Sequence, residues 1–389
     1  MPKSDVDRSD VNRVPNLWKS NGREGAKGER DKPYRGRDEA RAGLSLLWQL
    51  RQWLFSPLDE QLKLSKKNWS PETIQNAVRL GVEIASYERA AATFEALTRI
   101  PLSKSSLQRL VNETGAILVE EQEAEAKAMV QIPKKEEEVV WREAPAPDSE
   151  VMSVSSDGVM VNIIDEGWKE VKAVSVSAVS RSVNEESGEV EVHLSNHSYR
   201  AGLWDAATFT NHHWAESCRR GLEKATTIVC ISDGALWIWA MVFLCFSRRI
   251  EVLDWWHAVQ RLWAIALGTY DPVNAAPWVA QAKGCLARSQ LRYLFRQIRR
   301  LYPRGTPLPE SVRQAIGYLF RNRHRMDYAS FRQQGLPIGS RTIESACKTV
   351  VQARMKQAGM RWSRNGAQSM IALRCLLLSD RWNEIPLPT

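Results

Sequence analysis

The sequence predicts an α/β protein in which an all-helical N-terminal part precedes a mixed five-stranded sheet that carries a helical insertion. Up to about residue 130, apolar residues recur with helical spacing. After residue 150 the pattern changes to short β-branched runs separated by turn residues. Two later runs lead directly into helices, which is typical of the parallel crossovers of an α/β sheet.

Composition limits the class of protein and of partner. The chain has 389 residues, 43% hydrophobic and 25% charged, which suits a globular protein of one to three domains. Its net charge of +9 favours a polyanionic partner. No apolar run approaches the roughly 20 residues of a membrane span. The six cysteines form no C-x-x-C pair, which predicts reduced thiols in a cytoplasm and argues against a cysteine zinc site.

The N-terminal part divides into a polar arm and a helical domain. Residues 1–42 have little apolar content and predict a disordered arm. Residues 43–130 predict a helical domain. Within it, Ser70-Pro71 predicts a helix start, because proline suits the first helical position. The apolar face of the helix that follows is Ile74, Ala77, Val78, Gly81, Val82 and Ala85.

Residues 86–115 predict a helix-turn-helix. The first helix would bury Ala91, Phe94 and Leu97, and Ile100-Pro101-Leu102 would form the turn. The second helix would begin at Ser103 and point Leu107, Leu110 and Val111 inward. Its exposed side would then carry residues able to reach base edges or phosphates: Lys104, Ser105, Ser106, Gln108 and Arg109. An ordinary helical hairpin is the alternative. The short turn and the polar second helix favour DNA binding.

An acidic, proline-containing linker at 131–150 separates this domain from the C-terminal domain, 151–389. In chain order, the β-rich runs of the C-terminal domain predict a meander followed by parallel crossovers. The β-rich runs are 151–155, 159–164, 171–179 and 189–194, which are expected to form three strands, and further strands are predicted at 226–233 and 250–253. Helices are predicted at 204–222, at 235–246 and from 255 onward.

Residues of about 256–335 predict a helical insertion that is unusually rich in arginine. From 288 to 325 there are ten arginines against a single acid, Glu310. Arginine forks onto phosphate oxygens, so this excess favours contact with a nucleic acid backbone. The residues that we assign to phosphate contact are Arg292, Arg296 and Arg299. A plain solvated helix face is the alternative.

Three carboxylates stand at positions that suit a metal site. Asp157 and Asp233 are each expected to end a strand, and each precedes a glycine that lets a substrate approach. A simple Asp-Gly turn is the alternative for both. Glu344 is expected in the first turn of a helix capped by Ser340 or Thr342. The basic residues that follow it are candidates for DNA contact: Lys348, Arg354 and Lys356.

Together the three carboxylates could hold two Mg²⁺ or Mn²⁺ ions. Such a pair of ions clamps the attacking and leaving oxygens in phosphoryl transfer. Magnesium takes hard oxygen ligands from one or two carboxylates and from the substrate phosphate. The predicted site therefore needs acids rather than histidines as ligands.

Four segments resemble a known family in both content and order. The first is Ser155-Ser156-Asp157-Gly158 together with residues 168–172 of the next strand, and the second is Ser232-Asp233-Gly234 continuing through 235–239. The third is Asp254-Trp255-Trp256-His257, and the fourth is 339–348 together with 354–363. Across residues 57–382 the chain resembles the DDE insertion-sequence transposases of the ISKra family, in the Mutator-like superfamily. Relatives often carry cysteine pairs before the helix-turn-helix, whereas the first cysteine here is Cys218.

The resemblance implies an RNase H-like catalytic core with Asp157, Asp233 and Glu344 as its metal-binding triad. It also implies double-stranded DNA as partner, both element ends and target, and at least a homodimer on DNA in a prokaryotic nucleoid. Asp254-x-x-His257 corresponds to a motif of these enzymes, with Asp254 supporting His257. By its chemistry His257 could contact a phosphate or the transition state, or could be a packing histidine. There are two alternative functions: a nuclease without strand transfer, and an inactive DNA-binding remnant.

Overall fold

A computed structural model describes residues 69–130, 144–185, 188 and 190–388. The predicted arm, the start of the helical domain and most of the predicted linker lie outside the described residues. Residues 62–389 fall in one compact unit, and every element below belongs to it.

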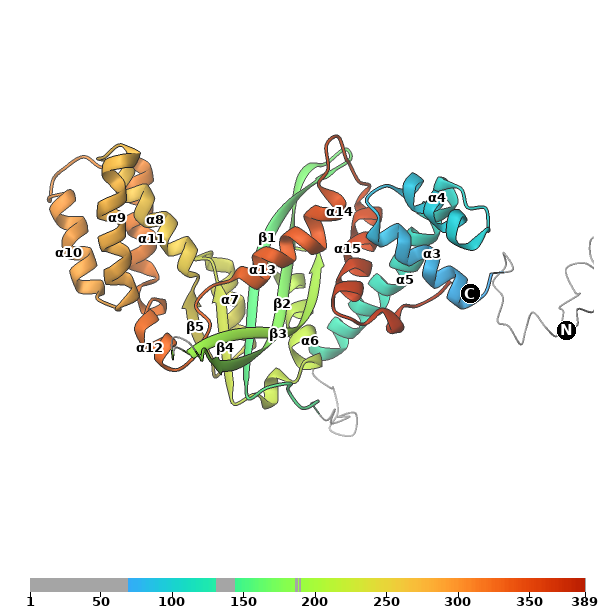
Figure 1. Cartoon of the computed structure of the whole chain (residues 1–389), viewed down its shortest axis with the longest axis horizontal. Helices are drawn as coiled ribbons and strands as arrows, with labels where there is room; N and C mark the ends of the chain where they lie inside the picture. Colours follow the sequence, from blue (N-terminus) through green and yellow to red (C-terminus); the bar gives the residue numbers. More distant parts are fainter. Residues whose placement is uncertain (1–68, 131–143, 186–187, 189, 389) are drawn as a thin grey trace, which may run out of the picture. The chain divides into compact units, whose positions relative to one another are not determined.

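The centre of this unit is a five-stranded mixed sheet in the order β3-β2-β1-β4-β5 (Figure 1). Strands β1, β2 and β3 form an antiparallel meander, and β1, β4 and β5 run parallel. This confirms the predicted α/β class and the meander followed by parallel crossovers. The strands are β1 (Val151–Ile163), β2 (Gly167–Val183), β3 (Val190–Gly202), β4 (Thr227–Ser232) and β5 (Ile250–Leu253).

Strand β1 differs from the prediction. The sequence predicted two runs divided at Asp157-Gly158, but β1 is continuous and Asp157 pairs with Ala173 in its interior. Pairing with β2 extends along the whole of β1 and keeps the Asp-Gly step extended. The chain turns further on, where Asp165 adopts φ 63°. An Asp-Gly hairpin at residue 157 is thus excluded.

Helices after β3 cover the sheet and build the insertion. Helices α6 and α7 pack on Met152, Val154 and Cys230. Helices α8 to α11 lie side by side beyond β5 (Figure 1), and with α12 they share a core with Val252 and Leu253. Helices therefore occupy the range of the predicted insertion. These helices are α6 (Ala206–Arg219), α7 (Leu236–Cys245), α8 (Trp255–Leu267), α9 (Pro272–Ala287), α10 (Leu291–Leu301), α11 (Glu310–Arg321) and α12 (Tyr328–Gln333).

The N-terminal helices are α3 (Pro71–Glu83), α4 (Tyr87–Thr98) and α5 (Lys104–Val130). Their predicted inward residues are buried, with two exceptions: Leu97 is 72% exposed, and Ala85 is half-buried and lies beyond the end of α3. All three pack into one hydrophobic core with α15 (Arg364–Leu378) and with Val159, Val161 and Ile163 of β1. The helices assigned from sequence to a separate domain therefore share the core of the C-terminal part.

One further helix completes the part of the unit that positions the candidate site. Helix α13 (Arg341–Ala346) continues through a π-helical stretch, Cys347–Gln352, into α14 (Ala353–Met355). Helix α13 contacts β1 and β2. Such π-helical turns are frequent at functional sites. Among the helices in the described ranges, none has the length and apolar character needed to cross a membrane.

Candidate acidic active site

Three aspartates follow the last paired residues of the three parallel strands. The registers end at Ser156↔Ser232 and Ser232↔Leu253. One residue further along each strand stand Asp157, Asp233 and Asp254. Residues at the same level of neighbouring strands face the same side of a sheet. The register therefore places the three aspartates in one row, on the side that α13 approaches.

Ser232 fixes this row from the centre. Its hydroxyl accepts a hydrogen bond from the Ser156 amide and donates one to the Ser156 carbonyl, both at 3.2 Å. Its carbonyl accepts from the amide of Asp254 at 2.9 Å. The backbones that carry the three aspartates are thereby tied together.

Asp254 is fully buried and accepts hydrogen bonds on both oxygens. Oδ1 accepts from the backbone N–H of His257 at 2.8 Å and from its Nδ1 at 2.9 Å. Oδ2 accepts from the backbone N–H of Ser340 at 2.5 Å and from its hydroxyl at 2.8 Å. Burial alone would raise the pKa of Asp254, but the hydrogen bonds from His257 and Ser340 outweigh it and lower the pKa. Asp254 therefore joins the starts of α8 and α13.

His257 is held by Asp254 and turned toward the other acids. The hydrogen bond that His257 Nδ1 donates to Asp254 raises the pKa of His257, and the negative charges of Asp233 and Asp157 raise it further, against the opposing effect of burial. Because Nδ1 binds Asp254, Nε2 is the ring nitrogen left for a substrate. Its side chain is 25% exposed, so the ring is open to one side. These contacts favour a functional role over simple packing.

Asp157 sits in a partly closed environment. Its Oδ1 accepts from the Gly158 amide at 2.7 Å, and the Cys347 thiol lies 3.8 Å from Oδ2. Burial raises the pKa of Asp157, and the negative charge of Asp233 adds to that shift, while the Gly158 amide and His257 oppose it. A bound cation would favour the ionised form of Asp157 and so oppose this shift.

The Asp233 loop rests on the insertion. Asp233 Oδ1 accepts from the Ala235 amide at 3.0 Å, which turns the chain toward α7. The Gly234 amide donates to the hydroxyl of Tyr318 on α11 at 3.0 Å. A Cβ on residue 234 would lie 2.3 Å from the Tyr318 ring, so only glycine fits. Helix α11 thus supports the loop directly.

Glu344 approaches from α13 and is half-buried. One ligand atom from each of Glu344, His257 and Asp254 lies within 4.8 Å of the others. The Ser340 hydroxyl does not cap α13 as predicted, because it donates to Asp254 instead. Asp254 already accepts four hydrogen bonds, so we assign it to positioning and leave Glu344 as the available carboxylate of this group.

Of the predicted acids, Glu344 has a ligand atom within 4.8 Å of one from His257, whereas Asp157 and Asp233 act on His257 through their negative charge. Asp157 and Asp233 come from the sheet, and Glu344 comes from α13. The carboxylates offer the hard oxygen donors that Mg²⁺ or Mn²⁺ prefers, and the negative charge of Asp233 that raises the pKa of Asp157 fits a bound cation. That all three share two ions stays a prediction. Sequence reasoning missed Cys347 and Tyr318, because nothing local marks residues that meet the site only through folding.

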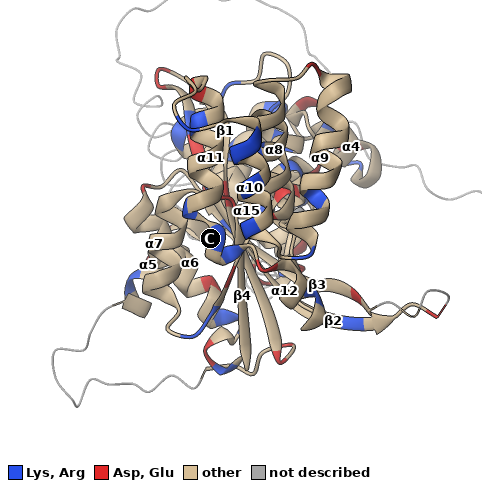
Figure 2. Cartoon of the chain, turned by 90° about the vertical axis from the view of Figure 1, so that its left-hand side faces the viewer, with Lys and Arg blue, Asp and Glu red and all other residues tan. Residues whose placement is uncertain are grey.

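Most residues predicted to contact DNA lie on the surface of the described part of the chain. Figure 2 shows Lys and Arg, in blue, on α10 and α11. Ser106 is half-buried. The exposed ones are Lys104, Ser105, Gln108, Arg109, Arg292, Arg296, Arg299, Lys348 and Lys356.

Arg354 is a correction to the predicted DNA-binding set. It is 2% exposed, with its guanidinium 4.6 Å from the Tyr87 ring centre and 5.1 Å from that of Trp362. Its Nε and Nη2 both donate to the Gly81 carbonyl at 3.3 Å. Arg354 therefore joins α14 to α3 inside the core and is not available to DNA.

A comparison with protein-family models gives no match to this chain, and a comparison with curated proteins gives none either.

Proposed function

We propose that this protein is a metal-dependent DNA transposase that cuts DNA at element ends and joins them to target DNA. One observation carries the proposal: Asp157 and Asp233, each one residue beyond the last parallel pair of β1 and β4, lie near enough to His257 for their charges to act on it, and Glu344 of α13 reaches the same histidine. Acids gathered beside a half-buried histidine that stays open to one side suit phosphoryl transfer. The strand order is compatible with an RNase H-like core, and the helical insertion lies between Asp233 and Glu344 as in the resembling family.

The residues would divide the work as follows. Asp157, Asp233 and Glu344 would hold two Mg²⁺ or Mn²⁺ ions, which when bound supply Lewis acidity to the phosphate and lower the pKa of water. His257, whose pKa the hydrogen bond to Asp254 raises, would in its protonated form donate Nε2–H to a phosphate oxygen. Asp254 and Ser340 would hold that ring and the start of α13 in place.

The reaction proposed is two displacements at phosphorus. In the first, a water oxygen bonds to the phosphorus, and the 3′ oxygen leaves and takes up a proton as a free hydroxyl. In the second, that 3′ hydroxyl bonds to a target phosphorus while the target's own 3′ oxygen leaves. No covalent bond to the protein forms. Two element ends must be joined, so at least a homodimer would act on DNA.

Glu344→Gln tests the proposal. The amide keeps the shape of the side chain and removes its charge. With labelled end DNA and Mg²⁺ we expect the parent protein to cut and the variant to bind the same DNA but to cut at least about 100-fold more slowly, since removing one group that stabilises the transition state costs about that much. Glu150→Gln, an exposed Glu just before β1, is the matched control and should cut normally.

The same assay separates the alternatives. A chelator should abolish cutting by the parent protein. Cutting that persists in chelator, or a protein–DNA adduct that survives denaturant, would sink the mechanism. Cutting without joined products would favour a nuclease without strand transfer. Binding without any cutting in the parent protein would favour an inactive remnant.

A further inference from the structure

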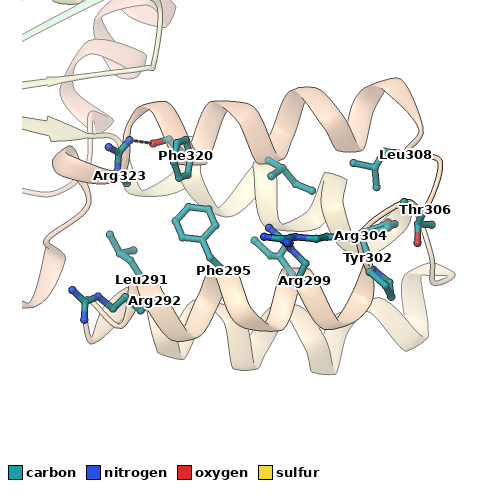
Figure 3. Close-up of a pocket in the computed structure, with 14 residues that line it drawn as sticks. Leu291, Arg292, Phe295, Arg299, Tyr302, Arg304, Thr306, Leu308, Phe320 and Arg323 are labelled. Atoms are coloured by element: carbon teal, nitrogen blue, oxygen red, sulfur yellow. Dashed lines mark hydrogen bonds between the residues drawn. The ribbon is translucent and has the colours of Figure 1, made fainter.

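A groove runs between α10 and α11 in the insertion, with a volume of about 780 Å³ (Figure 3). Its floor is apolar and includes Phe295 and Phe320, and four arginines stand along it: Arg292, Arg299, Arg304 and Arg323. No acid lines it. Such a combination of apolar floor and uncompensated positive charge calls for a ligand that is both flat and anionic.

The aromatic residues supply the flat surface. Phe295 and Phe320 meet edge to face, with ring centres 5.8 Å apart at 74°. Phe320 is 55% exposed although it lies beside buried residues of α11. A large apolar ring left this open is costly in water. It is positioned to receive another ring.

The arginines supply the charge. The Arg323 guanidinium lies 4.4 Å from the Phe320 ring centre, and its Nη1 donates to the Phe320 carbonyl at 2.8 Å, as Figure 3 shows. Arg292, Arg299 and Arg304 are exposed. None of the four forms an ion pair with any of the residues that the structure describes. Their charge is therefore free for an external anion.

Helix α11 connects this groove with the acidic site. Ile316 and Phe320 line the groove, while Tyr318 on the opposite side of the same helix supports Gly234 beside Asp233. A strand held in the groove would thus be bound by the same rigid element that supports the catalytic loop.

We propose that this groove binds an unpaired DNA strand, with bases on Phe295 and Phe320 and phosphates on the arginines. Single-strand sites combine stacking rings with basic grooves in this way. A duplex keeps its base faces stacked inside, so it would use the arginines but not the rings. The inference rests on the proposed function and adds to it a site for a strand freed when an end is cut.

Binding measurements with the full chain in chelator test the groove without requiring cleavage. We compare a labelled 12-nucleotide single strand with a duplex of the same sequence by fluorescence anisotropy. Phe320→Ala should weaken single-strand binding about tenfold and duplex binding by less than about twofold, since stacking contributes at about this level per base. Phe320→Trp should restore single-strand binding. Arg299→Ala should weaken single-strand binding and reduce its salt slope by about 0.7.

Two neighbouring residues on α10 serve as matched controls. Tyr293 is an aromatic residue, 40% exposed, and Arg300 is an exposed arginine; neither lines the groove. Tyr293→Ala and Arg300→Ala should leave the preference for single strands unchanged. If Phe320→Ala weakens both DNAs alike, or behaves as Tyr293→Ala does, the groove proposal falls. If the protein still cuts end DNA in that case, the proposed function stands. If the parent protein binds neither DNA, both fall.

Discussion

At the scale of single residues, the contacts of Asp254 explain why an acid at this position, three residues before His257, suits the site. It caps α8 with one oxygen, orients the imidazole with the same oxygen, and holds the start of α13 with the other. The sequence predicted support of His257 by Asp254. It could not predict the bond to Ser340, because that residue is 86 positions away. Positioning of Glu344 therefore depends on a contact that only the fold creates.

Asp254→Asn should damage cleavage more than DNA binding. Asparagine places an NH₂ group against donors that the carboxylate accepted, so either His257 or Ser340 loses its partner. Loss of residues that orient a metal-site ligand typically costs about 10–100-fold in activity, and we expect a loss of that size in single-turnover cutting. Ser340→Ala removes only the hydroxyl and should cost less. Equal rates for Asp254→Asn and the parent protein would contradict the positioning role.

Arg354 and Lys356 should respond in opposite ways to alanine. Arg354→Ala removes a buried guanidinium that two aromatic rings and the Gly81 carbonyl hold, so it should lower the free energy of unfolding by roughly 2–3 kcal/mol. Lys356→Ala, at an exposed position, should change stability little and weaken DNA binding. Urea unfolding and salt-dependent binding measure the two effects. If the Arg354→Ala variant were as stable as the parent protein and its DNA binding depended less on salt, Arg354 would contact DNA as the sequence predicted.

At the scale of elements, local sequence patterns correctly predicted those features that depend on residues close together in the sequence. The buried faces of α3 and α5 follow from helical spacing, and β4 and β5 from short apolar runs. Two predictions were wrong where the outcome depends on whether an element distant in sequence contacts the residue. Strand β1 continues through Asp157-Gly158 because β2 pairs with it. Leu97, at the last turn of α4, stays exposed because no element covers it among the described residues.

The second helix of the predicted helix-turn-helix allows a test at this scale. Its Leu107, Leu110 and Val111 are buried as predicted, and Arg109 is exposed. Arg109→Ala should reduce binding to element ends about 5–100-fold and binding to random DNA much less, because a base contact is worth about 1–3 kcal/mol. Arg89→Ala, an exposed arginine on α4, is the control. Competition binding measures the preference, and equal loss on both DNAs would exclude a recognition role for Arg109.

At the scale of the whole compact unit, buried charges join elements far apart in sequence. Glu125 of α5 binds Arg200 of β3 and Arg219 of α6, and Glu216 of α6 binds Arg381 after α15. Burial alone would raise the pKa of Glu125, but the two arginines outweigh it and lower the pKa. The sequence showed only an acidic tail here. Charge partners cannot be read from sequence when they are 75 to 165 residues apart.

Two buried histidines of α6 should make the stability of the unit depend on pH. Burial lowers the pKa of His213 to about 3, and burial together with Arg200 and Lys127 lowers that of His212 to about 3. Their unfolded pKa is near 6.5, so between pH 6.5 and 3 the unfolded chain binds more protons. Stability is therefore fully present above pH 6.5 and falls as the pH drops, by about 1 kcal/mol per histidine for each pH unit. Urea unfolding between pH 7.5 and 5 measures this before Glu125 titrates. His213→Leu should reduce the slope by the share of one histidine, about 1 kcal/mol per pH unit, and His193→Gln, at an exposed position, is the control. A flat profile in the parent protein would show that these histidines are not buried in their neutral form.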